Sequence, residues 1–126
     1  MYKEIMEKVK ATNPSSEKII YTTPISTELF KALIETELLD DYEVWLRDLV
    51  DVYGGAWNFM YPNMITNDIT NYFDGHHFYP EVGNLLALRI KGEDVGAVPE
   101  DFGVYVTNEN IDEHLEDVRV LAESIE

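Results

Sequence analysis

The chain has 126 residues, of which 45% are hydrophobic, so it is long enough for one folded domain and too apolar for a disordered one. It contains no cysteine, which excludes disulfides, zinc–thiolate sites and cysteine nucleophiles. The net charge of −16 argues against binding to nucleic acid or to anionic membrane surfaces, because both need clustered Lys and Arg. The longest apolar runs are too short for a membrane-spanning segment.

The first part of the chain predicts a helix, a strand and a second helix. Apolar residues recur at helical spacing from the N-terminus until Asn13-Pro14, which should end the first helix. Lys18–Ile25 is rich in β-favouring residues and is predicted to be a short buried strand. Ser26 or Thr27 can cap the helix that follows, whose predicted apolar stripe is Leu29, Phe30, Leu33, Ile34 and Leu38.

The middle of the chain predicts a helix, a second strand and a long loop. Tyr42–Tyr53 has the strongest helical pattern, and Gly54-Gly55 should end it. Ala56–Tyr61 is the second strand candidate, and a loop over residues 63–79 follows it. Gly54-Gly55 has no phosphate-loop context, and the aromatic residues of this region are typical of a core.

The last part predicts two more helices. Pro80 suits the first position of a helix, which Lys91-Gly92 should end. An extended stretch at Phe102–Thr107 and a final helix from Ile111 are also expected. Helices that alternate with short buried strands favour an α/β fold with a small parallel sheet and amphipathic helices.

The stretch DGHHFYPEVG, residues 74–83, is the strongest candidate for chemistry. Asp74 and His77 are spaced so that the carboxylate can accept a hydrogen bond from Nδ1–H of the imidazole, with Gly75 allowing the tight turn between them. Such a bond fixes the tautomer and leaves Nε2 as a base. We therefore expect an Asp74 oxygen within about 3.5 Å of His77 Nδ1.

The run YFDGHHFYPEVGNLLALRI resembles the closing catalytic block of SGNH (GDSL-type) hydrolases and acyltransferases. The resemblance covers roughly residues 1–92 and implies a partial flavodoxin-like, three-layer arrangement. It implies that Asp74 and His77 are the acid and base of a Ser-His-Asp triad, whereas His76 falls on a variable position. It also implies an ester substrate, such as an acylated glycan, and requires no cofactor.

The chain departs from this family at the nucleophile. The family takes its serine from a Gly-Asp-Ser turn, and none of the four serines here has that context. Asn67-Asp68 resembles the family's asparagine block only superficially, because it lies within the final catalytic loop. The sequence therefore predicts a truncated segment with the Asp–His pair and no nucleophile, inactive alone.

Other readings of the same residues remain open. Asp74 and His77 can form a capped turn without function, or they can join His76 and Glu81 in a metal site. Thr23 or Ser26 can replace the missing serine, although helix capping explains Ser26 more simply. The chain as a whole can also be a non-catalytic structural or interaction module.

The expected organisation is an SGNH-like half domain over residues 1–92, with an acidic tail and C-terminal helix, residues 93–126, packed on it. From Glu93 onward the chain contains 11 acidic residues and one basic residue, Arg119, a composition that is typical of a solvated surface. A half domain leaves apolar surface uncovered, so a homodimer or a separate N-terminal half is the expected partner. The predicted interface contributors are Lys18–Ile25, Trp45, Leu49, Leu115 and Val118.

Overall fold

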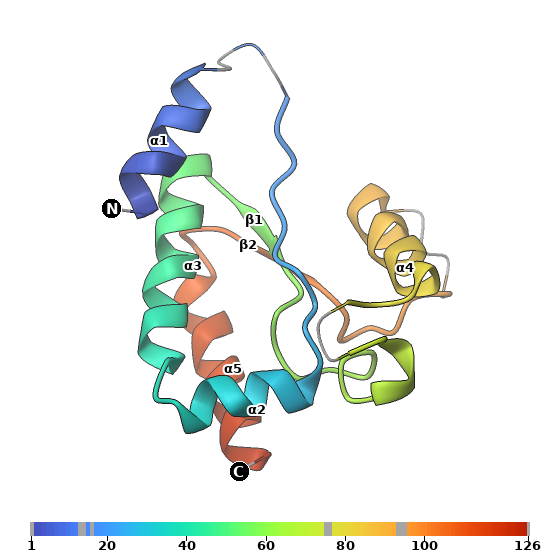
Figure 1. Ribbon diagram of the computed structural model, residues 1–126. Helices are drawn as coiled ribbons and strands as arrows, with labels where there is room; N and C mark the ends of the chain where they lie inside the picture. Colours follow the sequence, from blue (N-terminus) through green and yellow to red (C-terminus); the bar gives the residue numbers. More distant parts are fainter. Residues whose placement is uncertain (1, 13–14, 16, 75–76, 93–95, 126) are drawn as a thin grey trace.

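A computed structural model describes residues 2–12, 15, 17–74, 77–92 and 96–125. Figure 1 shows helices gathered around a very small sheet. The elements in chain order are α1 (Tyr2–Thr12), α2 (Thr27–Glu35), α3 (Leu39–Tyr53), β1 (Ala56–Asn58), the 3-10 helix η1 (Ile69–Asn71), α4 (Pro80–Lys91), β2 (Val104–Val106) and α5 (Ile111–Ser124). The protein is therefore mixed α/β, as predicted. None of the described helices is long and apolar enough to cross a membrane.

The helix boundaries follow local signals in the sequence. Ser26 caps α2, since its Oγ accepts the Leu29 N–H at 3.2 Å. Gly54 and Gly92 end α3 and α4 with positive φ angles of 84° and 73°, a conformation that glycine adopts without a Cβ penalty. Pro80 opens α4, as predicted. Asn13-Pro14, the expected end of α1, lies outside the described residues.

The predicted stripe of α2 is only partly correct. Phe30 is buried, and Leu33 and Ile34 pack at the edge of the core. Leu29 and Leu38 are instead exposed. The predicted stripe runs too far because α2 ends at Glu35, and Leu38 lies beyond it at the start of α3.

The predicted parallel sheet is wrong. The described residues form a two-stranded antiparallel sheet in which Ala56, Trp57 and Asn58 pair with Val106, Tyr105 and Val104. Lys18–Ile25, which we call the edge segment, is extended but forms no named strand. It touches β1 through one parallel bridge, Tyr21 to Trp57. The flavodoxin-like arrangement expected from the resemblance is therefore not observed.

Side chains explain why both strands are shorter than expected. After the bridge, Thr22 Oγ1 accepts the backbone N–H groups of Phe59 and Met60 at 2.8 and 3.1 Å, where a ladder would use a carbonyl. Asn58 Oδ1 also accepts the Met60 N–H at 3.1 Å. These bonds turn the chain away from extended pairing, which agrees with the tendency of Thr and Asn to compete with secondary structure.

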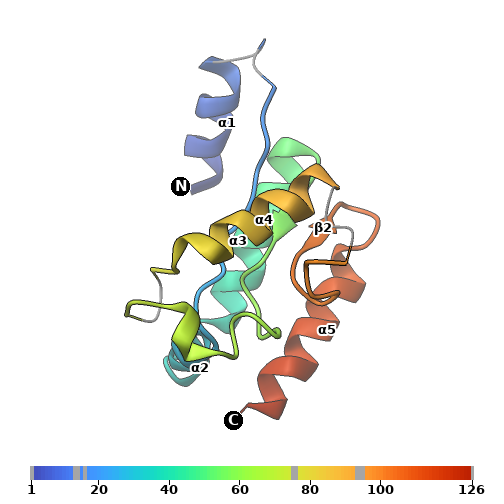
Figure 2. The same cartoon turned by 90° about the vertical axis from the view of Figure 1, so that its right-hand side faces the viewer.

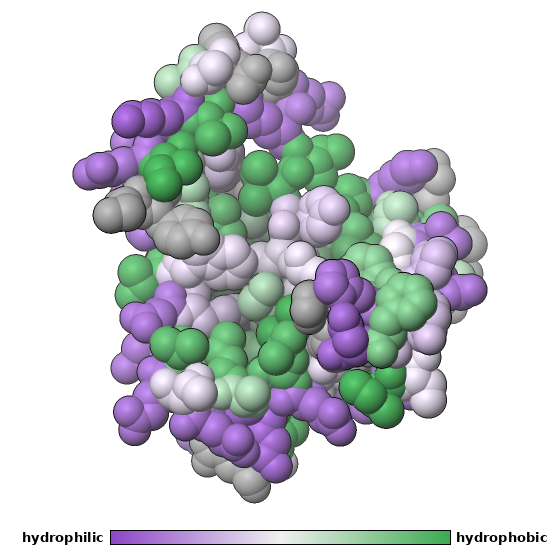
Figure 3. Space-filling model, in the orientation of Figure 1, coloured by the Kyte–Doolittle hydropathy of each residue, from purple (hydrophilic) through white to green (hydrophobic). Residues whose placement is uncertain are grey.

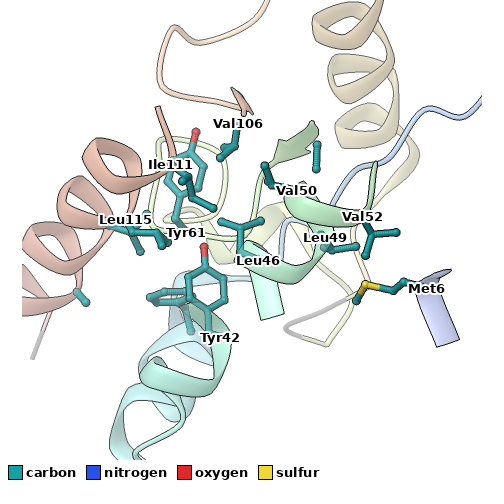
Figure 4. Packing of buried hydrophobic residues seen from close by; sticks show 14 residues of the cluster. Met6, Tyr42, Leu46, Leu49, Val50, Val52, Tyr61, Val106, Ile111 and Leu115 are labelled. Carbon is teal, nitrogen blue, oxygen red and sulfur yellow. The ribbon is translucent and has the colours of Figure 1, made fainter. Parts of the chain in front are cut away.

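Two hydrophobic clusters lie on opposite sides of β1, as the alternation of a strand requires. Ala56 joins the larger cluster, which Figure 4 shows between α1, α3 and α5. Trp57 and Phe59 join the smaller cluster with Val82 and Leu86 of α4. In Figure 1, α4 accordingly lies across the sheet from α1 and α3. The loop that carries Asp74 and His77 leads into α4.

The C-terminal part of the chain belongs to the larger cluster. Val106, Ile111, Leu115, Val118 and Ala122 are all buried there. Arg119, on the outer side of α5, binds Asp40 and Glu43 of α3, each at 2.7 Å. The prediction that Leu49, Leu115 and Val118 form an interface is wrong, because the chain buries them itself.

Candidate functional site

The Asp74–His77 pair lies in a tight loop whose two arms are hydrogen-bonded. Tyr72 and Phe78 form an antiparallel bridge, and the Phe73 N–H donates to the His77 carbonyl at 2.8 Å. The Tyr79 N–H donates to Asn71 O at 2.9 Å just outside this bridge. The arms therefore fix the backbone on both sides of the pair.

Tyr72 anchors the loop to the edge segment. Its ring is buried, and its hydroxyl donates to Pro24 O at 2.6 Å. Burial raises the pKa of the Tyr72 phenol, so the hydroxyl remains a donor across the ordinary pH range. The pair is thereby held near the end of the edge segment, where Ser26 begins α2.

The carboxylate of Asp74 holds His77 through two contacts. Asp74 Oδ2 lies 2.7 Å from His77 Nδ1, and Asp74 Oδ1 accepts the His77 backbone N–H at 2.9 Å. The predicted contact between carboxylate and imidazole is confirmed. A neutral imidazole whose Nδ1 donates a proton carries its free lone pair on Nε2, which can then act as a base.

The pair is open to solvent and sits among exposed aromatic rings. The side chains of His77 and Asp74 are 64% and 50% exposed. Phe73 and Tyr79, which alternate along the arms with Tyr72 and Phe78, are also exposed, and their ring centroids are 4.1 Å apart. The imidazole is thus accessible to a reacting group from outside, and an exposed aromatic pair lies on the same loop.

The helix after the loop fixes the loop's far end. Val82 and Leu86 of α4 are buried in the smaller cluster. Arg89 then ties α4 to the following loop, donating from Nε to Phe102 O at 2.9 Å and from Nη2 to Pro99 O at 2.6 Å. The loop that carries the pair is therefore followed by a helix that is packed against the rest of the protein.

The candidate replacement nucleophiles are less favourable. Ser26 is fully buried, and its Oγ is occupied in capping α2. Thr23 is exposed and lies one residue before Pro24, with no described base bonded to its hydroxyl. A nucleophile needs a hydrogen bond to its base, and Ser26 Oγ is bonded to the Leu29 N–H instead.

The loop's other polar residues serve its own structure. Thr27 Oγ1 donates to Asn67 Oδ1 at 2.6 Å, which joins the loop to α2. Asp68 caps η1 through the Thr70 N–H and hydroxyl, and these hydrogen bonds lower the pKa of its carboxyl group. Asn67-Asp68 therefore holds the loop and resembles no oxyanion site.

The structure does not bring a metal site together in the part of the chain that it describes. No group of three or more His, Asp or Glu side chains there is placed to hold an ion. His76, which the metal hypothesis requires, and Gly75 lie outside the described residues.

A second histidine forms a buried network that sequence reasoning missed. Asn58 Nδ2 lies 2.8 Å from His114 Nε2 and 2.9 Å from the Tyr42 hydroxyl, while Asn58 Oδ1 accepts the Thr22 hydroxyl at 2.8 Å. Burial lowers the pKa of His114 to about 4, although Asp117 acts in the opposite direction. The imidazole is therefore neutral at pH 7.

The sequence did contain a signal for His114. Ile111, Leu115 and Val118 mark the buried stripe of α5, and position 114 falls on the same face. A shallow pocket of about 230 Å³ next to it is lined by Val104, Asn110, Glu113, His114 and Asp117. The network joins α3, β1, α5 and the edge segment, so its role is structural.

Comparison with known proteins identified no relative of this chain. No family profile matches the sequence, and neither the curated proteins nor the solved structures give a significant match.

Proposed function

We propose that this chain carries the base and the orienting acid of an SGNH-type ester hydrolase or O-acyltransferase. The single observation behind the proposal is the 2.7 Å contact between Asp74 Oδ2 and His77 Nδ1. Its substrate would be an acyl ester, with acylated glycans the class that the resemblance suggests. A nucleophilic hydroxyl from outside these 126 residues would complete the site.

The chemistry assigned to the pair is general acid–base catalysis. His77 Nε2 takes the proton of the attacking hydroxyl while its oxygen bonds to the ester carbonyl carbon. Asp74 stabilises the imidazolium that forms. The same proton then passes to the departing alkoxide, which leaves as an alcohol as the acyl group stays on the nucleophile. Water or an acceptor alcohol repeats the sequence and frees the nucleophile.

The surroundings of the pair support this assignment. The imidazole is exposed to solvent, so a hydroxyl group from another segment can reach it. Ser26 is committed to capping α2, which favours a nucleophile supplied by another segment.

The state of His77 tests the geometry directly. Long-range ¹H–¹⁵N NMR above the titration range should find neutral His77 mainly as the Nδ1–H tautomer. Asp74→Ala should shift it towards Nε2–H, the form favoured by free imidazole, whereas Asp68→Ala, in the same loop, should leave it unchanged. A wild-type His77 that is mainly Nε2–H would rule out the orienting role of Asp74.

A chimaera tests catalysis. The Gly-Asp-Ser-bearing N-terminal half of an SGNH hydrolase is joined to this chain, and hydrolysis of a short aryl ester is measured. We expect no turnover by the chain alone and turnover by the chimaera that His77→Ala lowers by at least about 10³-fold, because the triad acts as a unit. His114→Gln is the matched control and should retain activity.

Two results would contradict the proposal. One is a chimaera that is folded by circular dichroism yet has no His77-dependent turnover. The other is turnover by the chain alone that is lost in His77→Ala, which would place a nucleophile within these residues.

The second candidate is a non-catalytic interaction module. The observation that favours it is the open outer side of the edge segment, where Ile19 and Tyr21 are exposed. A chimaera without turnover, together with a defined assembly through this segment, would support that candidate.

A further inference from the structure

The outer side of the edge segment is an open strand edge. In the parallel bridge to Trp57, the bonding groups on the edge segment are Ile20 O and the Thr22 N–H, at 2.8 and 2.9 Å. The N–H and C=O of Tyr21, between them, therefore point away from β1. No described residue bonds to them. An unpaired edge of this kind recruits another strand.

We propose that a second copy of this chain pairs with this edge, so that two edge segments lie antiparallel about a two-fold axis at Tyr21. In this register Tyr21 of each copy donates its N–H to the partner's Tyr21 carbonyl. An edge with one central residue whose donor and acceptor both point outward is self-complementary, as a two-fold interface requires. Ile19 of one copy then lies opposite Thr23 of the other.

The pair of Tyr21 residues at the two-fold axis would make most of the backbone hydrogen bonds in this register. The Thr23 carbonyl, which would be the next outward acceptor, already accepts the Ile25 N–H at 3.0 Å. Backbone hydrogen bonding between the two edge segments is therefore centred on Tyr21 and does not extend past Thr23. The result is a short, specific edge contact.

Side chains along the edge favour the same contact. Ile19 and Tyr21 are 60% and 51% exposed, while Thr22 and Pro24, which alternate with them, are buried. Tyr21 lies beside Trp57, and Trp57 beside Tyr105, so the three aromatic residues form a row across one face. Two-fold pairing would place Tyr21 against the partner's Tyr21 and double the length of this row.

The surface next to the edge is also apolar. Figure 1 shows the edge segment running between α1 and α4, and Figure 2 shows it from the side of α4. In Figure 3, hydrophobic side chains gather over α1 and the upper part of the edge segment on the visible face. Ile5 of α1 is 54% exposed. Pairing would cover part of this surface.

The charge of the N-terminal part that carries the edge is nearly balanced, which favours contact between two copies here. Residues 1–27 contain four basic and three acidic residues, whereas residues 28–126 contain five basic and 22 acidic residues. Contact elsewhere would bring strongly acidic surfaces together. At this edge the local charge is almost balanced, and the distant repulsion is screened beyond roughly 10 Å at moderate salt.

Sedimentation and amide exchange of the full chain test the proposal. We expect a concentration-dependent dimer in the micromolar range. The Tyr21 amide should become protected from exchange as the dimer forms, because in the monomer none of the described residues accepts a bond from it. The Thr22 amide, bonded to Trp57 O, should be protected at every concentration.

Two variants locate the interface. Tyr21→Pro removes the outward donor but leaves both inward bonds to Trp57, and it should raise the dimer dissociation constant more than tenfold. Ile19→Lys, which leaves the backbone unchanged, should weaken the dimer in the same direction and serves if Tyr21→Pro unfolds. Val120→Lys makes the same change at an exposed site on α5 and should have no effect.

Two outcomes would overturn the proposal. The first is a monomer up to about 200 μM, well above the expected micromolar range. The second is a dimer in which the Tyr21 amide exchanges freely or Ile19→Lys has no effect, since its interface would then lie elsewhere. Protection of Tyr21 that disappears with the dimer supports it.

Discussion

His114 is a neutral histidine held inside the protein, and this makes stability depend on pH. In the unfolded chain the imidazole binds a proton below its usual pKa of 6.5, but in the folded protein it does so only near pH 4. Between these values the unfolded state binds more protons. The contribution of His114 is therefore complete above pH 6.5 and is lost as the pH falls towards 4.

We expect this loss to reach roughly 2 kcal/mol of unfolding free energy by pH 4.5. His114→Gln can keep an acceptor for Asn58 Nδ2 and cannot titrate, so it is the reference. Urea unfolding of both proteins at pH 7 and pH 4.5 gives the difference. Both proteins contain the same carboxylates, so the difference between their pH dependences isolates the contribution of His114. Equal pH dependence in the two would contradict this expectation, because it would mean that His114 binds a proton as readily in the folded protein as in the unfolded chain.

The two histidine sites differ in how far the sequence could predict them. Asp74 and His77 are three residues apart, so their contact depends on local spacing, and it was predicted. The partner of His114 is Asn58, which is far away in sequence and reaches it only after α5 packs on α3. A helical period places His114 on the buried face, but it cannot identify the amide that meets it.

At the scale of elements, the approach to β2 depends on a glycine. Gly103 has φ of 95°, and an added Cβ would overlap the ring of Phe59, which is fully buried after β1. Its N–H also donates to the Tyr61 hydroxyl at 2.9 Å. This position thus combines a left-handed backbone with close packing against a core ring.

Gly103→Ala should lower the free energy of unfolding by about 2 to 4 kcal/mol, because it adds a steric clash to the cost of a positive φ. Gly54→Ala is the matched control. Its φ is 84°, and nothing lies within 4 Å of an added Cβ, so about 1 kcal/mol is expected. Chemical unfolding measures both. Equal losses would mean that the Phe59 ring moves aside freely.

Helices were predicted better than strands for a physical reason. A cap such as Ser26, a first-turn Pro80 and a terminal Gly92 each act within a few residues, so the sequence shows them directly. The strands end where Thr22 and Asn58 divert backbone bonds into side-chain bonds. The orientation of β2 depends on a partner far along the chain, and no local pattern indicates it.

At the scale of the whole molecule, charge and apolar surface are separated. The acidic residues concentrate after residue 27, while the open edge lies in the more balanced N-terminal part. The prediction of uncovered apolar surface agrees with the exposure of Ile19 and Tyr21 on the edge segment, but it was wrong for the apolar residues of α5. It failed there because β2 and α5 fill the space against α3 that the expected half domain would have left empty.

The position of β1 in the middle of the chain constrains the order of folding. Its two neighbours come from opposite directions, the edge segment from the N-terminal side and β2 from the C-terminal side. Each contact closes a long loop of the chain. The conformational entropy of that loop is lost before the contact contributes any stabilisation. During synthesis the ribosome must release residue 106 before β1 can acquire its antiparallel neighbour. Until then Trp57 of β1 lacks its cross-strand neighbour Tyr105, which leaves that ring more open to other nascent chains and to chaperones.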